Sequence, residues 1–180
     1  MSTFRIQLYE SRQAVFSAYD PRSAEVAALL IHAIEERNQR LRADHIGSTA
    51  VPECRGKGVI DLAVTYAEGD LESAKTTLDT LGFQRQAGPE PWPETRPMRV
   101  ADVVALDATF QVHAHVIARE GDEHRVLLGF RDSLRRDPKL RRAYEEDKER
   151  ILASGLADAV EYSKAKGSFI DGVLSRIARP

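Results

Sequence analysis

The chain has 180 residues, of which 42% are hydrophobic and 30% charged, with one cysteine and a formal net charge of −2. This length suits one domain with a substantial core, and the composition is that of a folded protein rather than a disordered one. The near-balance of charge argues against nonspecific binding to nucleic acid or to an anionic membrane. We expect a cytoplasmic protein, because the single Cys54 excludes an internal disulfide and the chain has neither an apolar signal region nor an apolar run of ~20 residues.

The first half of the chain predicts strands and helices in alternation. Asp20-Pro21 is typical of a helix start, and Gly82 is typical of a helix end. The stretch 59–66 is apolar except for Asp61 and Thr65, as in an inner strand covered on both faces. The expected elements are strands over 4–9, 44–47 and 59–66 and helices over 21–42 and 71–81.

The second half changes character after a loop and a hairpin. Residues 87–97 contain four prolines around Trp92, which indicates a loop, and a hairpin around Asp107 follows. The fold class is therefore α/β (α+β), a small mixed sheet with flanking helices in residues 1–120 and a C-terminal helical part in residues 121–180 that packs on this core. The expected elements are strands over 98–105 and 109–118 and helices over 123–136, 138–153 and 157–177.

A glycine and two hydroxyl residues, Gly47-Ser48-Thr49, follow the second predicted strand. Such a turn offers backbone N–H groups and side-chain donors to an anion, although by itself this short motif is more typical of a plain turn stabilised by its own hydroxyls. Asp61 is costly in an apolar strand unless it is paired, hydrogen-bonded or bound to a metal. It either accepts hydrogen bonds from the two hydroxyls or serves as a metal or substrate ligand.

Three polar residues alternate along the last predicted strand, so Gln111, His113 and His115 share one face of the sheet. With Asp61 or Asp44 nearby, the two histidines and a carboxylate suit zinc, iron or manganese. The alternatives are contacts to a substrate in a cleft and a polar face that is open to solvent.

The predicted C-terminal helices each carry a Tyr-x-x-x-Lys pair on an apolar stripe, Tyr144 with Lys148 and Tyr162 with Lys166. Arg131 lies on a similar stripe. Each cation either extends its stem over apolar surface with its charge in water, or faces a shared anionic target such as phosphate. Five further basic residues lack interleaved aromatic residues and predict a solvated face: Arg135, Arg136, Lys139, Arg141 and Arg142.

The segment 44–52, followed by Lys57 and residues 60–62, resembles the hallmark of the GrpB-like family, and later landmarks match in order. This resemblance implies a nucleotidyltransferase-like fold in which Gly47-Ser48 is a phosphate-holding turn. Asp61 would be the carboxylate on the next strand. Glu53 and Gly58 stand where the family pattern has glycine and proline, so a different path of this loop is expected.

A second departure concerns the chemistry. Active nucleotidyltransferases carry an Asp-x-Asp pair that holds two magnesium ions, and the second position here is Ala63. The predicted function is a phosphotransfer enzyme for a nucleotide or phosphorylated small molecule, using Mg²⁺ or Mn²⁺ at Asp61. The phosphate contacts would come from Gly47, Ser48, Thr49, Lys57, Arg131, Tyr144, Lys148, Tyr162 and Lys166. The alternatives are an inactive module that binds a nucleotide or coenzyme A-like ligand and an antitoxin-like interaction protein that docks through Trp92.

Overall fold

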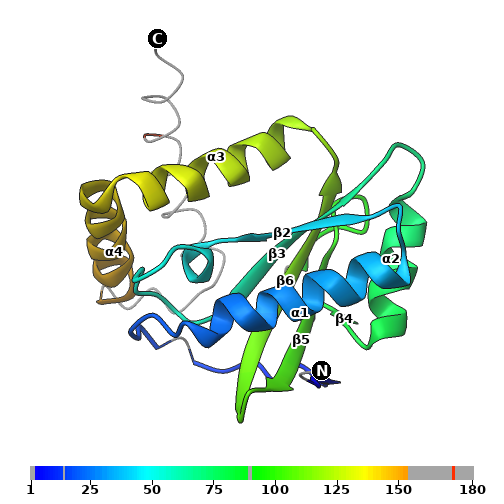
Figure 1. Ribbon diagram of the computed structural model, residues 1–180, viewed down its shortest axis with the longest axis horizontal. Coiled ribbons are helices and arrows are strands. Elements are labelled where there is room, and N and C mark those ends of the chain that lie inside the picture. The colour runs from blue at the N-terminus through cyan, green and yellow to red at the C-terminus, as the bar shows by residue number, and fades with distance from the viewer. Residues whose placement is uncertain (1–2, 14, 89–90, 154–171, 173–180) are drawn as a thin grey trace.

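A mixed six-stranded sheet lies at the centre of the fold (Figure 1). The computed structural model describes residues 3–13, 15–88, 91–153 and 172. The strands are β1 (Arg5–Gln7), β2 (Arg42–Ile46), β3 (Ile60–Tyr66), β4 (Gln84–Arg85), β5 (Met98–Ala105) and β6 (Ala108–Ala118). The helices are α1 (Arg22–Arg37), α2 (Leu71–Leu81), α3 (Asp122–Arg136) and α4 (Pro138–Ala153), with a 3₁₀ turn η1 at Ser48–Ala50. The predicted α/β fold class is confirmed.

The sheet has the order β1-β5-β6-β3-β2, with β4 also paired to β5. β3 and β6 run parallel, and the other pairs are antiparallel. β3 is therefore an inner strand, as predicted, with β2 on one side and β6 on the other. The parallel register sets Asp61 beside His113 and Ala63 beside His115.

Helices cover both faces of the sheet (Figure 1). The main apolar core lies between one face and the helices α1 and α2, and it includes Leu30, Leu62 and Leu78. On the opposite face Leu127 and Leu128 of α3 pack against the sheet. α4 packs beside η1 and α3 around a separate cluster formed by Val51, Cys54, Phe130, Leu134 and Tyr144.

Several predicted helix and turn signals are confirmed. Gly82 ends α2 in a left-handed conformation (φ 103°). The β5–β6 hairpin turns at Leu106 and Asp107, which both have positive φ, as a two-residue hairpin of right-handed twist requires. Asp137 caps α4, because its carboxylate accepts hydrogen bonds from two backbone N–H groups of the first turn.

The first helix was expected to extend to Arg42, which is wrong: α1 ends at Arg37. Asn38 adopts an extended conformation, and its side-chain amide donates to the hydroxyls of Ser73 and Thr77 on α2. Leu41 continues the apolar periodicity of the helix, which made the predicted helix too long. Leu41 is buried in the same core, but it lies in the segment that leads into β2. The short strand β4 was also missed.

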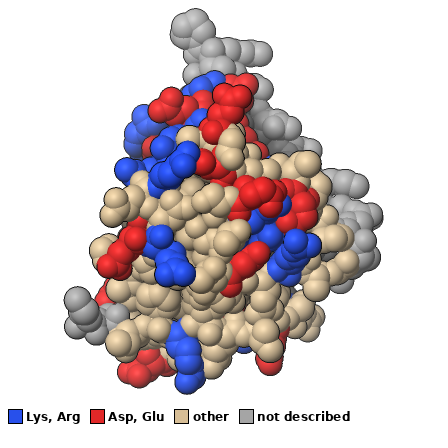
Figure 2. Space-filling model, turned by 90° about the vertical axis from the view of Figure 1, so that its right-hand side faces the viewer, with Lys and Arg blue, Asp and Glu red and all other residues tan. Residues whose placement is uncertain are grey.

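Two remaining expectations concern the helical part and the surface. The helix predicted over 157–177 lies outside the described residues, apart from residue 172. Across the part of the chain that is described, no helix has the length and apolar character to cross a membrane. Lysine and arginine side chains are interspersed with acidic ones on the face drawn in Figure 2, consistent with the small net charge.

Candidate functional site

The glycine turn lies directly against the carboxylate of β3. Gly47 has φ 72° and ψ −169°, a conformation that essentially only glycine adopts without strain. A Cβ atom at this position would lie 2.5 Å from Oδ2 of Asp61. The absence of a side chain therefore allows the turn and the carboxylate to meet.

A hydroxyl and an ammonium group flank a second glycine in the same region. A Cβ on Gly56 would lie 2.6 Å from Oγ of Ser48 and 3.1 Å from Nζ of Lys148. The Lys148 side chain is 2% exposed, and its ammonium donates to the Arg55 carbonyl and lies 4.3 Å from the centre of the Tyr144 ring. The structure thus brings the predicted residues Ser48 and Lys148 together across one glycine.

Asp61 is approached by both histidines of β6. Its Oδ1 lies 3.7 Å from Nδ1 of His113 and 3.6 Å from Nε2 of His115. The other nitrogen of each ring has a different partner: Nε2 of His113 lies 3.2 Å from the Tyr9 hydroxyl, and Nδ1 of His115 lies 3.2 Å from Nη1 of Arg96. The sheet register alone accounts for this convergence, since all three side chains share one face.

The position two residues after Asp61 is buried and carries no carboxylate. Ala63 is fully buried in the apolar cluster with Ile46 and Ile117, so no second carboxylate occupies that place on β3. Among the described residues, no group of three or more His, Cys, Asp or Glu side chains could hold a metal ion. Asp44 lies opposite Ala63 on β2, and its carboxylate accepts from Nε2 of His124 at 3.0 Å.

Thr49 is bonded within the protein. Its hydroxyl donates to the Val59 carbonyl (3.0 Å) and lies 3.0 Å from Nε2 of His45, which must then be the donor. Burial lowers the pKa of His45 to about 4, although the Asp61 carboxylate opposes this shift. These bonds fix η1 to the start of β3, and Asp61 is not the acceptor for the Thr49 hydroxyl.

The remaining predicted phosphate ligands are distributed more widely. Arg131 donates to the His45 carbonyl (3.0 Å) and to Asp132, so it ties α3 to the end of β2. Tyr144 is buried edge-on against Phe130, and Lys57 is half-buried in the loop before β3. Tyr162 and Lys166 lie outside the described residues.

Sequence reasoning did not place three residues beside the histidines, although it named Trp92 as a candidate docking residue. Tyr9 contacts His113, Arg96 contacts His115, and Trp92 lies edge-on to the His115 ring with centroids 6.1 Å apart. Trp92 is 43% exposed and carries the Arg96 guanidinium over its ring, so it borders the site. Burial, and then the nearby Asp102 charge, raises the pKa of Tyr9, which keeps its hydroxyl protonated. No sequence spacing links these residues to β6.

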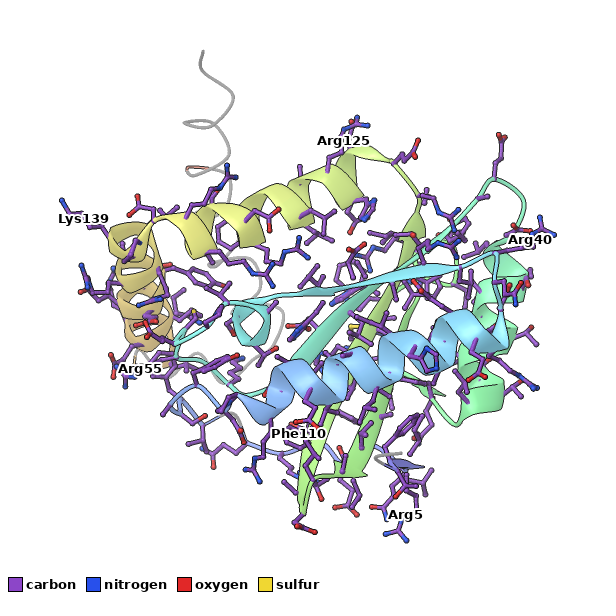
Figure 3. The ribbon with its side chains drawn as sticks, in the orientation of Figure 1. Arg5, Arg40, Arg55, Phe110, Arg125 and Lys139 are labelled. Carbon is purple, nitrogen blue, oxygen red and sulfur yellow. The ribbon has the colours of Figure 1, made fainter. Side chains whose placement is uncertain are left out.

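Basic side chains elsewhere have other surroundings. Lys139 and Arg125 point away from the molecule in Figure 3. Arg55, labelled in the same view, lies near α4, where it is 3.5 Å from Glu149 and stacks over the Phe16 ring. Arg141 is bonded to the Pro52 carbonyl and to Glu53, so this member of the predicted solvated cluster is tied to the loop after η1.

Fold and site together define a mixed α/β protein in which a glycine-serine turn meets a single strand carboxylate. The chain belongs to the GrpB family, since the family model described as "GrpB protein" matches residues 6–176. The resemblance found in the hallmark motif is thereby confirmed.

Relatives with similar sequences carry only a family designation. A UPF0157 protein from Vibrio cholerae is 34% identical over 152 residues, covering 84% of this chain and 71% of that protein. One from Streptomyces coelicolor is 32% identical over 170 residues, covering 93% and 86%. The crystal structure of the conserved protein GrpB from Enterococcus faecalis is similar in fold, with a TM-score of 0.61, 19% identity, and coverage of 89% of this chain and 99% of that one. The RNA terminal uridylyl transferase Cid1 is more distantly similar, with a TM-score of 0.49, 12% identity, and coverage of 74% of this chain and 44% of that one.

The departure from the family pattern at Glu53 has a simple structural outcome. Glu53 has φ 63°, a left-handed conformation that glycine adopts at no steric cost. The backbone at Glu53 thus takes a conformation to which glycine is suited, and a different path of this loop stays a prediction.

Proposed function

We propose that this protein is a phosphotransfer enzyme of nucleotidyltransferase-like type that acts on a nucleotide or another phosphorylated small molecule. The observation that carries the proposal is the meeting of the Gly47-Ser48 turn, the Asp61 carboxylate and the Lys148 ammonium at two glycines that have no room for a side chain. Phosphoryl transfer depends mainly on positioning and charge neutralisation, and these groups supply both.

Each residue has a distinct part in this proposal. The Ser48 hydroxyl has no hydrogen-bond partner among the described residues, so it is available to a phosphate oxygen. Lys148 is held beside it by the Arg55 carbonyl and by the face of the Tyr144 ring, so its positive charge is fixed in place before a ligand binds. Asp61 would either bind one divalent ion or orient an acceptor hydroxyl, whose oxygen would form the new P–O bond while the bond to the leaving phosphate or diphosphate breaks.

The residues present fit one divalent cation at Asp61 but not two. A second carboxylate on the same strand is excluded by the buried Ala63. A magnesium or manganese ion held by Asp61 would supply neutralising charge at the phosphate group.

The same observation at Ala63 favours a second candidate. A site with one carboxylate can bind a nucleotide or a coenzyme A-like ligand without transferring its phosphate, and the protein would then be a ligand-binding module. The two candidates share the turn and Lys148 but differ in turnover and in their need for a divalent ion.

A thermal-shift screen tests the proposal. The wild-type protein is heated with ATP, CTP, GTP, UTP or coenzyme A, with and without MgCl₂. A ligand present at a hundred times its dissociation constant stabilises the fold by ~2.7 kcal/mol, which raises the melting temperature by several degrees. The proposal predicts a magnesium-dependent rise that Asp61→Asn abolishes and that Gly56→Ala reduces, because the added methyl displaces Ser48 and Lys148.

Gly129→Ala is the matched control, since its added methyl meets no atom within 4 Å. Consumption of the stabilising nucleotide, followed by chromatography, separates the enzyme from the binding module. If none of the compounds stabilises a folded wild-type protein, the phosphotransfer proposal is wrong.

A further inference from the structure

The ring of His115 lies between a cation and an anion. Its Nδ1 is 3.2 Å from Nη1 of Arg96, and its Nε2 is 3.6 Å from Oδ1 of Asp61. Arg96 is held there by two further contacts, an ion pair with Glu123 from the first turn of α3 and stacking over the Trp92 ring. The orientation of His115 is thus set by groups from the 91–97 loop, α3 and β3.

The contact with Arg96 determines which nitrogen of His115 carries the proton. A guanidinium group has five N–H donors and no acceptor, so Nδ1 of His115 must be the acceptor. In a neutral imidazole the other nitrogen is then the donor. The proton of His115 therefore lies on Nε2, the atom that faces Asp61.

This arrangement differs from that of a metal-binding histidine. A ligating nitrogen presents its lone pair to the metal, while the opposite nitrogen donates its N–H to a carboxylate or carbonyl group. Here the opposite nitrogen faces a donor in place of an acceptor. The described residues place no acceptor within hydrogen-bond distance of Nε2, since the Asp61 oxygen at 3.6 Å is beyond a normal N–H···O bond.

We propose that Arg96 makes His115 a fixed hydrogen-bond donor in this site, so that His115 receives an oxygen atom of the ligand and does not bind a transition metal. This differs from the metal site of two histidines and Asp61 that the sequence predicts. His113 lacks such a constraint, because its outer partner is the Tyr9 hydroxyl, which can either donate or accept. The inference concerns the site itself and requires neither a nucleotide nor turnover.

Nuclear magnetic resonance of the full-length protein labelled with ¹⁵N-histidine tests the assignment directly. Long-range ¹H–¹⁵N correlation spectra at a pH where His115 is neutral distinguish the two tautomers, and His115→Gln identifies the signal. We expect the proton on Nε2 in the wild-type protein. A signal from the Nδ1–H tautomer would overturn the proposal without any variant of Arg96.

Replacement of Arg96 provides the second measurement. Arg96→Gln offers an amide oxygen that can accept from Nδ1, whereas Arg96→Lys keeps a donor-only group and is the matched control. Cobalt(II) is the metal probe, and the ligand-field absorption that disappears in His115→Gln reports binding to this ring. We expect this absorption in Arg96→Gln and its absence from the wild-type protein and from Arg96→Lys even at ~10-fold higher cobalt concentration, because outer partners of metal ligands change metal affinity by about 10- to 100-fold.

Two results would contradict this expectation. One is cobalt binding through His115 in the wild-type protein, and the other is an unchanged tautomer and cobalt affinity in folded Arg96→Gln. Neither readout depends on a nucleotide. If the ligand screen fails, the conclusion about His115 is therefore unaffected, and if the tautomer is contradicted, the phosphotransfer proposal is still tested only by the ligand screen.

Discussion

The contact between the glycine turn and Asp61 makes a sharp prediction for Gly47→Ala. Both Gly47 (φ 72°) and Gly69 (φ 84°) have positive φ, but the added methyl meets the Asp61 carboxylate only at Gly47 and meets no atom within 4 Å at Gly69. Backbone strain costs about 1–3 kcal/mol at either position. At Gly47 the methyl would also lie 2.5 Å from Oδ2 and 3.2 Å from Cβ of Asp61, far inside the ordinary contact distance of ~3.5–4.0 Å.

Asp61 lies on an inner strand and cannot yield easily, so overpacking should add about 1–3 kcal/mol at Gly47. Each kcal/mol lowers the melting temperature of a chain of this size by about 2–4 °C. Urea denaturation of Gly47→Ala, Gly69→Ala, Asp61→Ala and the Gly47→Ala/Asp61→Ala double variant measures the contact. We expect Gly47→Ala to be the less stable glycine variant and the double variant to lose less than the sum of its parts, by ~0.5–3 kcal/mol. Equal losses for the two glycine variants, with additive effects in the double variant, would refute the contact.

Three other predictions test separate features. The pKa of His45 is about 4 in the fold and 6.5 ordinarily, so His45 takes up its proton first in the unfolded chain as the pH falls. The free energy of unfolding should therefore drop by on the order of 3 kcal/mol between pH 6.5 and 4 in urea titrations. An equal drop in His45→Gln would contradict this. Glu53→Gly should be more stable than Glu53→Ala by about 1 kcal/mol in thermal denaturation, because both variants lack the ion pair with Arg141 but only glycine relieves the positive φ, and equal melting temperatures would count against strain at this residue. Lys148→Met should weaken binding of ATP with Mg²⁺ at least ~10-fold by calorimetry while the exposed Lys139→Met does not, and equal affinities would remove Lys148 from the site.

Much of the fold could be predicted from local sequence signals. The hairpin around Asp107, the left-handed Gly82 and the cap at Asp137 each depend on a few adjacent residues, and all three appear in the structure. The end of α1 could not be predicted in this way. Asn38 terminates the helix with bonds to α2, a partner 35 or more residues away along the chain, and the buried Leu41 extended the apolar period beyond the helix.

The candidate site shows the same division. Alternation along β6 correctly places His113 and His115 on one face, but their approach to Asp61 depends on the parallel pairing of β3 with β6. The outer partners of the two rings, Tyr9 and Arg96, come from irregular segments whose course has no periodic signal. Sequence reasoning therefore identified the ionisable side chains that meet in the structure and did not identify the residues that orient them.

The pairing of β3 with β6 also restricts how this family can change. Along β6 the same strand presents His113 and His115 to the site and Val112, Ala114 and Val116 to the core. A single-residue insertion or deletion within the strand would exchange the two sets and bury the imidazoles among the helices α1 and α2. The site can consequently diverge by point substitution while the core persists, whereas length changes must be confined to the loops, so homologues with altered chemistry should retain the spacing of this strand.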